Sequence, residues 1–325
     1  MRVGYLGRRL ASAFITILLL AVINFLLFRA MPGSPERIIL RGTPNTTQEQ
    51  LQAVRERWGL DKPVFPDQFV AYIGATIRGD LGYSFVARGQ NVVDVLSQKI
   101  WPTVILFGLG EFIAIVVGLA LGAYSGWKRG GVVDYLGNTI SLVLYSTPYF
   151  LLGMVMIILF SLGTGWFPPF GMVTSGAQFD SIFDRLADFG SHLVLPLVTV
   201  ALGLIGQYAI VMRSSIVETM SEDYVTTARG MGLSDRRVLR HHAIPNALLP
   251  TVSLIAINLG YVVAGAITVE VVFNWPGLGT LTVEALTARD YPVLQGVFLL
   301  LGVSVVLANL AADLVYAALD PRVRT

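Results

Sequence analysis

Six stretches of the chain are each long and apolar enough to cross a lipid bilayer. A membrane-spanning helix needs roughly 20 consecutive, mostly apolar residues. Only 14% of the 325 residues are charged, against about 25% in a typical soluble domain, and a soluble fold would have to expose much of the apolar surface to water. The sequence therefore predicts an all-α membrane protein with six transmembrane helices, at about Leu10–Ala30, Thr103–Ser125, Leu136–Leu162, Leu193–Met212, Leu248–Phe273 and Val293–Leu319.

Composition excludes several other classes of protein. The net charge of +2 gives no electrostatic basis for binding nucleic acid. The absence of cysteine excludes disulfides, thiolate metal sites and cysteine nucleophiles. The first apolar stretch follows Arg8 and Arg9, but it is longer than the apolar region of a signal peptide and five further stretches follow it. We therefore interpret it as an uncleaved membrane anchor.

Lysine and arginine are distributed unequally between the connecting segments, which predicts the orientation in the membrane. If the N-terminus lies inside, the short outer loops contain only Arg185 and Arg289. Cytoplasmic loops carry the excess of positive charge in membrane proteins, so both termini are predicted to be cytoplasmic, in a multi-pass protein of the cytoplasmic membrane. The predicted cytoplasmic segments contain Arg2, Arg8, Arg9, Lys128, Arg129, Arg213, Arg229, Arg236, Arg237, Arg240, Arg322 and Arg324.

The segment Pro32–Trp101, between the first and second stretches, is much more polar than the rest. Its 70 residues include eight Lys or Arg and seven Asp or Glu, which predicts a small extracytoplasmic layer. Thr46–Trp58 and Phe65–Ile77 show the apolar spacing of amphipathic helices, and Asn91–Ile100 is predicted to lie along the membrane interface. The segment is either a packed cap that shields the spans or a docking surface for an external partner.

These assignments divide the chain into four parts. An N-terminal tail and the first transmembrane helix occupy residues 1–31, and the extracytoplasmic segment occupies residues 32–101. A five-helix core follows at residues 102–319, with a cytoplasmic tail at residues 320–325. The core contains the longest predicted cytoplasmic loop, at residues 213–249, on which the functional prediction depends.

Motifs of the common catalytic sites are absent from the sequence. There is no GxxxxGK[ST] motif, so the chain cannot bind ATP through a P-loop, and there is neither GxSxG nor HExxH. His241 and His242 are adjacent, and adjacent helical side chains point about 100° apart, which makes a poor metal pair. We therefore predict that the chain is not an enzyme and holds no metal or cofactor. A stand-alone channel or secondary carrier is the alternative from another class, and an intramembrane enzyme is the third.

The loop at residues 213–249 is ordered by its own sequence signals. Ser215–Ala228 can continue as helix, and Gly230 and Gly232 are predicted to break that helix. A second short helix is predicted over Asp235–His242, and Pro245 is expected to end it. The sequence thus predicts helix, glycine turn and helix, which is a compact element rather than a flexible linker.

The same loop resembles the EAA loop of ABC importer membrane subunits. In that pattern a glycine follows EAA after three residues, and a final proline comes thirteen residues after the glycine. Here the pattern falls on Thr226, Thr227, Ala228, Gly232 and Pro245, with threonine at the first two EAA positions. The run is similar to the variant of peptide-type importers at Thr227-Ala228-Arg229, Gly232-Leu233-Ser234 and Asn246-Ala247-Leu248-Leu249-Pro250.

The resemblance extends over nearly the whole chain, to the oligopeptide/dipeptide permease B-subunit family (OppB/DppB type). Seven short matches occur in the right order. They are Arg8-Arg9-Leu10, Pro32-Gly33-Ser34-Pro35, Leu60-Asp61-Lys62-Pro63, Gly79-Asp80-Leu81-Gly82-Tyr83-Ser84, Thr147-Pro148, Glu270-Val271-Val272-Phe273-Asn274-Trp275-Pro276-Gly277-Leu278-Gly279 and Asp320-Pro321-Arg322.

This family resemblance implies the type I ABC importer permease fold and a set of partners. Such a chain pairs with a second, C-type permease, with two ATPase subunits or domains that bind ATP and Mg, and with an extracytoplasmic solute-binding protein. The implied substrate is an oligopeptide or dipeptide, and the wider family also includes glutathione and nickel-complex importers, which these residues do not separate. No nucleic acid is implied, and membrane lipid surrounds the spans.

The cytoplasmic loop is the expected contact with the ATPases. Exposed ion pairs contribute only about 0–1 kcal/mol each, so we expect apolar Met231, Leu233 and Val238 to anchor the contact. The polar and turn residues assigned to the coupling loop are Thr226, Thr227, Ala228, Arg229, Gly232, Arg236, Arg237 and Pro245.

Ionisable residues inside the predicted spans are functional candidates, because each costs roughly 2.5–3.5 kcal/mol at the centre of a transmembrane helix. Glu111, Glu270 and Asp313 qualify, and a structural role is expected for Asp313. Glu270 lies near the predicted outer end of the fifth span. Either it belongs to the pathway or outer gate, or it makes a purely structural pair. The candidates for the pathway or outer gate are Glu111, Glu270, Phe273, Trp275 and Pro276.

Three glycines in the second span are spaced for helix packing. Gly118, Gly122 and Gly126 make two overlapping GxxxG steps. Small residues at this spacing let two helix backbones approach closely in a membrane. The sequence therefore predicts a tight helix contact here rather than a substrate site.

Overall fold

The computed structural model describes residues 3–30, 35–40, 47–57, 60–87, 89–262 and 267–319. Over these residues the secondary structure is helical, apart from one isolated β-bridge between Tyr83 and Asn91. Five helical stretches are long and apolar enough to cross a membrane. They are built on α1 (Val3–Ala30), α5 (Val92–Trp127), α8 (Ile182–Thr219), α11 (Ile244–Tyr261) and α14 (Tyr291–Leu319).

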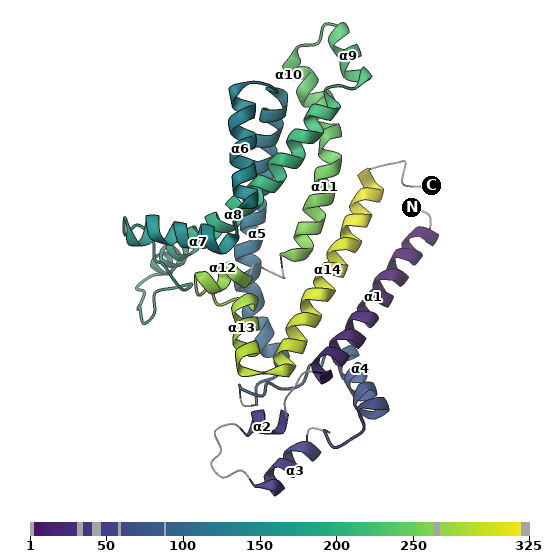
Figure 1. Ribbon diagram of the computed structural model, residues 1–325, viewed down its shortest axis with the longest axis vertical. Helices are drawn as coiled ribbons and strands as arrows, with labels where there is room; N and C mark the ends of the chain where they lie inside the picture. Colours follow the sequence, from purple (N-terminus) through teal and green to yellow (C-terminus); the bar gives the residue numbers. More distant parts are fainter. Residues whose placement is uncertain are drawn as a thin grey trace.

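The predicted span Leu136–Leu162 is bent. It consists of α6 (Val132–Ser146) followed by α7 (Tyr149–Met156), which continues as a π-helical segment, η2 (Ile157–Leu162). The two halves meet at 103°. Proline has no N–H to continue the helix and disfavours helical geometry at the residue before it, and Thr147 indeed has extended backbone ahead of Pro148. With the bent pair counted as one span, the predicted number of six spans is confirmed (Figure 1). The fifth predicted span, Leu248–Phe273, is too long: α11 ends at Tyr261, residues 263–266 lie outside the described residues, and Ile267–Val272 forms a separate short helix.

Two groups of shorter elements lie at opposite ends of the bundle. The elements α9 and α10 project from one end, and α2, α3 and α4 lie at the opposite end (Figure 1). The predicted helix within Thr46–Trp58 is confirmed for the described residues; Thr46 and Trp58 lie outside them. The predicted helix Phe65–Ile77 is confirmed except at its first residue, because Phe65 has extended backbone, with φ of −119° and ψ of 135°. The remaining helical elements of the described residues are α2 (Pro35–Ile39), α3 (Gln48–Arg57), η1 (Val64–Gln68), α4 (Phe69–Ile77), α9 (Asp223–Gly230), α10 (Asp235–Val238), η3 (Leu239–Ala243), α12 (Ile267–Val272) and α13 (Leu278–Ala288).

The segment Asn91–Ile100 does not lie along the membrane interface as predicted. Asn91 caps α5, because its side chain accepts a hydrogen bond from the Val93 N–H at 2.9 Å, and the helix then runs unbroken for 36 residues. At 1.5 Å per residue this is about 54 Å, longer than the roughly 30 Å of a bilayer's hydrocarbon core. The start of α5 therefore stands beyond the apolar layer as part of the helix itself.

The helices α5 and α8 form the most extensive helix pair in the bundle. The predicted close contact at the α5 glycines is confirmed, because all three face α8. A Cβ atom on Gly122 would lie 2.8 Å from the Met212 Cβ, and one on Gly126 would lie 2.9 Å from the Arg213 carbonyl oxygen. The absence of side chains at these positions thus allows the two backbones to touch.

Replacing Gly122 by valine is expected to separate α5 from α8. Forcing extra carbon atoms into a packed contact typically costs about 1–3 kcal/mol, so the midpoint of thermal unfolding in detergent will fall. Gly108→Val on the same helix is the control, because a Cβ there meets nothing within 4 Å. Equal stability of the two variants would contradict the contact.

Candidate functional site

The helical knob, defined here as Asp223–Ala243, projects beyond the end of α8. The predicted continuous helix Ser215–Ala228 is wrong, because α8 ends at Thr219 and a turn precedes α9. The acidic Glu222 and Asp223 stand at the start of α9, where the helix dipole favours negative charge. The new helix therefore begins where the sequence supplies a favourable start.

A Schellman motif built around Gly232 ends α9. Gly232 has the left-handed φ of +82°, its N–H donates to the Arg229 carbonyl at 2.9 Å, and the Leu233 N–H donates to the Ala228 carbonyl at 3.4 Å. This is the pair of hydrogen bonds that defines the motif, and glycine adopts the required conformation without steric cost. The predicted glycine turn is therefore confirmed and has a defined geometry.

The second helix of the knob does not end at Pro245 as predicted. The short helix α10 passes through the π-helical turn η3 directly into α11, where Pro245 is the second residue. Proline is tolerated in the first turn of a helix. The Asn246 side chain donates to the His242 carbonyl at 2.7 Å. The knob is thus joined to α11 without a flexible break.

Inside the knob, a small apolar cluster holds α9 against α10. Val225, Ala228 and Val238 are buried, with Leu233 packed against them. Val238 is fully buried and therefore cannot anchor an external partner, which corrects that expectation. Met231 is 68% exposed and remains available.

The polar residues of the knob face outward. Arg229 reaches Asp235 at 3.3 Å, and both side chains are exposed, so this pair adds little stability. At the base of the knob, Leu239 and Ala243 pack with Met212 and Ile216 of α8. The base of the knob is therefore packed directly against α8. The other exposed residues of the predicted coupling set are Thr226, Thr227, Gly232, Arg236, Arg237 and Pro245.

At the opposite end of the molecule, Glu270 binds the N-terminus of α13. Its carboxylate accepts hydrogen bonds from the Gly279 and Thr280 N–H groups at 2.7 and 3.2 Å and from the Thr103 hydroxyl at 2.6 Å. The Thr103 oxygen accepts the Leu278 N–H at 2.8 Å. The first N–H groups of a helix have no partner within it. Here Glu270 of α12 and Thr103 of α5 accept hydrogen bonds from the N–H groups of Leu278, Gly279 and Thr280.

The neighbouring gate candidates are buried in the same place. Glu270, Phe273 and Trp275 have at most 1% of their surface exposed, and the Trp275 indole donates to the Pro102 carbonyl at 2.9 Å. Because these side chains are buried, they fit a role in holding α5, α12 and α13 together better than a role in lining an open pathway. Their role in gating stays a prediction.

Glu111 lies in a second buried polar cluster, midway along α5. It accepts a hydrogen bond from the Tyr208 hydroxyl of α8, which itself accepts one from the Asn258 amide of α11 at 3.0 Å. Asn258 also donates to Gln207 at 3.3 Å. The structure therefore joins three helices through Glu111 and does not bring it near Glu270. The side chain of Asp313 lies outside the described residues.

Several of these partners were not identified from the sequence. Thr103 and Asn258 are neutral, and only their polar character within an apolar run could have pointed to them. Asp134 and Arg213, at the start of α6 and near the end of α8, form a two-contact ion pair with N–O distances of 2.5 and 2.9 Å. Both charged residues can be seen in the sequence, but no sequence pattern indicates that these two form a pair.

Two family models match the chain and together cover almost all of it. The model described as "Binding-protein-dependent transport system inner membrane component" matches residues 114–325. The model of the N-terminal part of such membrane components matches residues 2–107. The boundary between the matches falls within α5.

Curated relatives resemble the chain over its full length. A putative peptide permease protein of Brucella suis is 36% identical over 320 residues, 98% of each chain. A probable peptide ABC transporter permease protein of Sinorhizobium fredii is 38% identical, over 98% of this chain and 99% of its own. The glutathione transport system permease protein GsiC of Escherichia coli O6:H1 is 36% identical over 99% of both chains.

Among solved structures, inward-facing conformations of the MetNI methionine ABC transporter share the fold. One such chain aligns with a TM-score of 0.56 and 20% identity, over 70% of this chain and 97% of its own. The fold, the arrangement of spans and the full-length relatives agree, and the chain belongs to the family of binding-protein-dependent transport system inner membrane components.

Proposed function

We propose that the chain is the B-type permease subunit of an ABC importer that moves peptides across the cytoplasmic membrane. The observation that carries the proposal is the knob at the EAA-like residues, which is internally packed and joined to α8 and α11. A contact that converts ATPase movement into movement of the spans has to be rigid. Full-length similarity to peptide and glutathione permeases supports the same assignment.

In this proposal the knob faces the cytoplasm, together with both termini. The uneven distribution of Lys and Arg supports this orientation. Two ATPase subunits or domains dock at the end of the molecule that bears α9 and α10, and they bind the ATP and Mg. The side chains offered to them are the exposed Met231, Thr226, Thr227, Arg236 and Arg237.

The opposite end faces outward and receives a solute-binding protein, which supplies substrate recognition. Residues 32–101 and the region around α13 form the docking side, and a second, C-type permease completes the pathway. Selecting a metal ion or a phosphate requires several carboxylates or arginines close together. The predicted spans of this chain contain few such charges. A wide, mildly polar pathway suits peptides, which are zwitterions with variable side chains.

The test is ATP hydrolysis by the complete complex reconstituted in lipid. We expect short peptides to stimulate hydrolysis only when the binding protein is present, because the permease alone does not select the substrate. Deleting residues 48–57, which form the exposed helix α3, is expected to abolish the stimulation and to leave basal hydrolysis intact.

Three results would oppose the proposal. Peptide flux through the purified chain without ATPases would indicate a stand-alone carrier. Stimulation by glutathione or a nickel chelate but by no other peptide would change the substrate. Full stimulation after removal of α3 would remove that helix from the docking side.

A further inference from the structure

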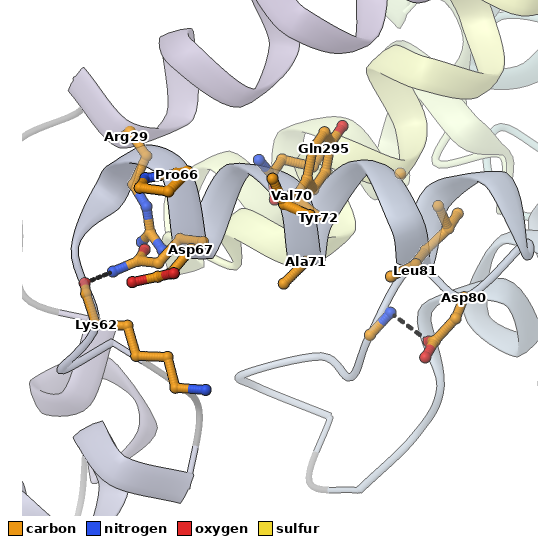
Figure 2. Close-up of a pocket in the computed structure, with 14 residues that line it drawn as sticks. Arg29, Lys62, Pro66, Asp67, Val70, Ala71, Tyr72, Asp80, Leu81 and Gln295 are labelled. Atoms are coloured by element: carbon orange, nitrogen blue, oxygen red, sulfur yellow. Dashed lines mark hydrogen bonds between the residues drawn. The ribbon is translucent and has the colours of Figure 1, made fainter.

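A cavity of about 630 Å³ lies beside α4, away from the knob and from Glu270. Its size falls within the range of roughly 300–1,000 Å³ found for small-molecule sites. Figure 2 shows Arg29, Asp67 and Lys62 at one side of the cavity and Asp80 and Leu81 at the other, with Gln295 of α14 behind α4. A second cavity, of about 280 Å³, shares Arg29 and Gln295 with the first and adds aromatic walls.

Residues around the cavity place it at the surface of the bilayer. Arg29 lies in the last turn of the apolar helix α1, where long basic side chains reach the lipid headgroups. Segment 64–77 presents large apolar side chains outward, including Val70 at 63% and Ile77 at 79% exposure. Apolar groups exposed beside the end of a transmembrane helix fit insertion into the upper acyl layer.

The walls of the cavity are held in place. The Phe25 ring of α1 contacts Phe65 and Phe69 at centroid distances of 5.9 and 5.3 Å. Asn24 of α1 donates both to the Tyr72 hydroxyl at 3.2 Å and to the Gln295 carbonyl at 3.0 Å. Three elements from distant parts of the sequence thus form one fixed enclosure.

Gln68 holds the wall of the cavity beside Lys62. Gln68 is 9% exposed, and its amide nitrogen donates to the Lys62 carbonyl at 2.6 Å. Its Oε1 is buried and presents no surface to the cavity. The groups that a ligand can reach are therefore the charged side chains of the lining.

The charges of the lining balance, with two cations at Arg29 and Lys62 and two carboxylates at Asp67 and Asp80. A neutral headgroup that carries both signs matches this set better than an anion does. Arginine and lysine are suited to a phosphate, while the Asp67 carboxylate is suited to a primary ammonium. The aromatic walls of the adjoining cavity suit the apolar part of such a molecule.

We propose that this cavity binds one membrane phospholipid whose headgroup contains a phosphate and a primary ammonium, of the phosphatidylethanolamine type. The phosphate lies between Arg29 and Lys62, and the ammonium donates to Asp67. The acyl chains follow the exposed apolar surface of α1. The bound lipid fixes α4 to α1 and α14, and this role is separate from transport.

The test measures lipid retained by the full importer complex, using native mass spectrometry after exchange into detergent with one defined lipid. Phosphatidylethanolamine, phosphatidylcholine and phosphatidylglycerol are compared. We expect phosphatidylethanolamine to bind about tenfold more tightly than phosphatidylcholine, because the choline group donates no hydrogen bond. Arg29→Gln and Lys62→Gln will each weaken its binding by about tenfold, since each removes a charged partner of the phosphate.

Variants separate the site from general effects on the fold. Asp67→Asn is expected to remove the preference for phosphatidylethanolamine while binding of phosphatidylcholine is unchanged. Arg78→Gln is the matched control, because Arg78 is an exposed cation at the end of α4 that does not line the cavity. Ala71→Trp fills the cavity without changing charge and will lower the binding of all three lipids.

Three outcomes would overturn the proposal. Equal binding of the three lipids to the unmodified complex would show no headgroup recognition. Equal losses in Arg29→Gln and Arg78→Gln would show a general charge effect rather than a site. Displacement of the lipid by a soluble dipeptide would assign the cavity to a zwitterionic solute instead.

Discussion

Replacing Gly232 by proline abolishes binding of the ATPase subunits while the chain stays inserted in the membrane. The φ of +82° at Gly232 is closed to proline, which requires about −65°. The substitution also removes the N–H that donates to Arg229 at 2.9 Å. Proline in such a position costs about 3 kcal/mol or more, and the knob has only a small apolar cluster to oppose that loss.

Two further variants make the result specific to the backbone geometry of the turn. Gly232→Ala places a Cβ in open space, so its only cost is the left-handed conformation, about 1–2 kcal/mol. It will weaken ATPase binding partly. Gly230→Ala lies two residues away inside α9, also in open space, and alanine favours helix, so binding is expected to be retained.

The measurement is co-purification of the ATPases with the permease, together with size-exclusion chromatography of the permease alone. Normal ATPase binding by Gly232→Pro would contradict the assignment of the knob as the coupling element. Aggregation of the permease would show that the effect extends beyond the knob. In that case the graded comparison of Gly232→Ala with Gly230→Ala still tests the turn.

The spans and the glycine turn could be predicted from the sequence because both have local causes. A run of apolar residues is required by the bilayer wherever it occurs, and a glycine flanked by a short helix on each side indicates a left-handed turn. The bend at Pro148 has a local cause too, although an apolar count alone treats Leu136–Leu162 as one straight span. The prediction for Asn91–Ile100 is wrong because the first turns of α5 are polar and resemble an interfacial segment. In the structure the Asn91 side chain caps the helix, and the helix runs from there into the span without a break.

The partners of Glu270 could not be predicted, because they come together only in the folded chain. Thr103 is 167 positions away in sequence, and the N–H groups of α13 belong to the backbone, which carries no sequence signal. The sequence identified Glu270 by its charge in an apolar span but left its role open. Folding places it against a helix N-terminus, where a carboxylate is stabilised by the helix dipole and by hydrogen bonds.

Replacing Glu270 by alanine is expected to have the largest effect on the fold at this end of the bundle. The change leaves the Gly279 and Thr280 N–H groups without a side-chain acceptor and removes the carboxylate that accepts from the Thr103 hydroxyl at 2.6 Å. Removing one side of a buried charged interaction typically costs about 3–5 kcal/mol. We expect a clear fall in the thermal unfolding midpoint of the complex and loss of transport.

Matched variants on the same elements separate the hydrogen bonds from the charge and from the surface. Glu270→Gln keeps one carbonyl acceptor for the α13 N–H groups, so its cost is expected to be about 1–2 kcal/mol. Glu284→Gln changes an exposed carboxylate of α13 and will stay within about 0.5 kcal/mol of the unmodified chain. Because the knob lies far from α12 and α13 (Figure 1), Glu270→Ala is expected to retain ATPase binding while transport is lost, the reverse of a defect in coupling. Equal stability of Glu270→Ala and Glu284→Gln would show that Glu270 does not hold α13, and loss of ATPase binding in Glu270→Ala would show that the two ends do not act separately.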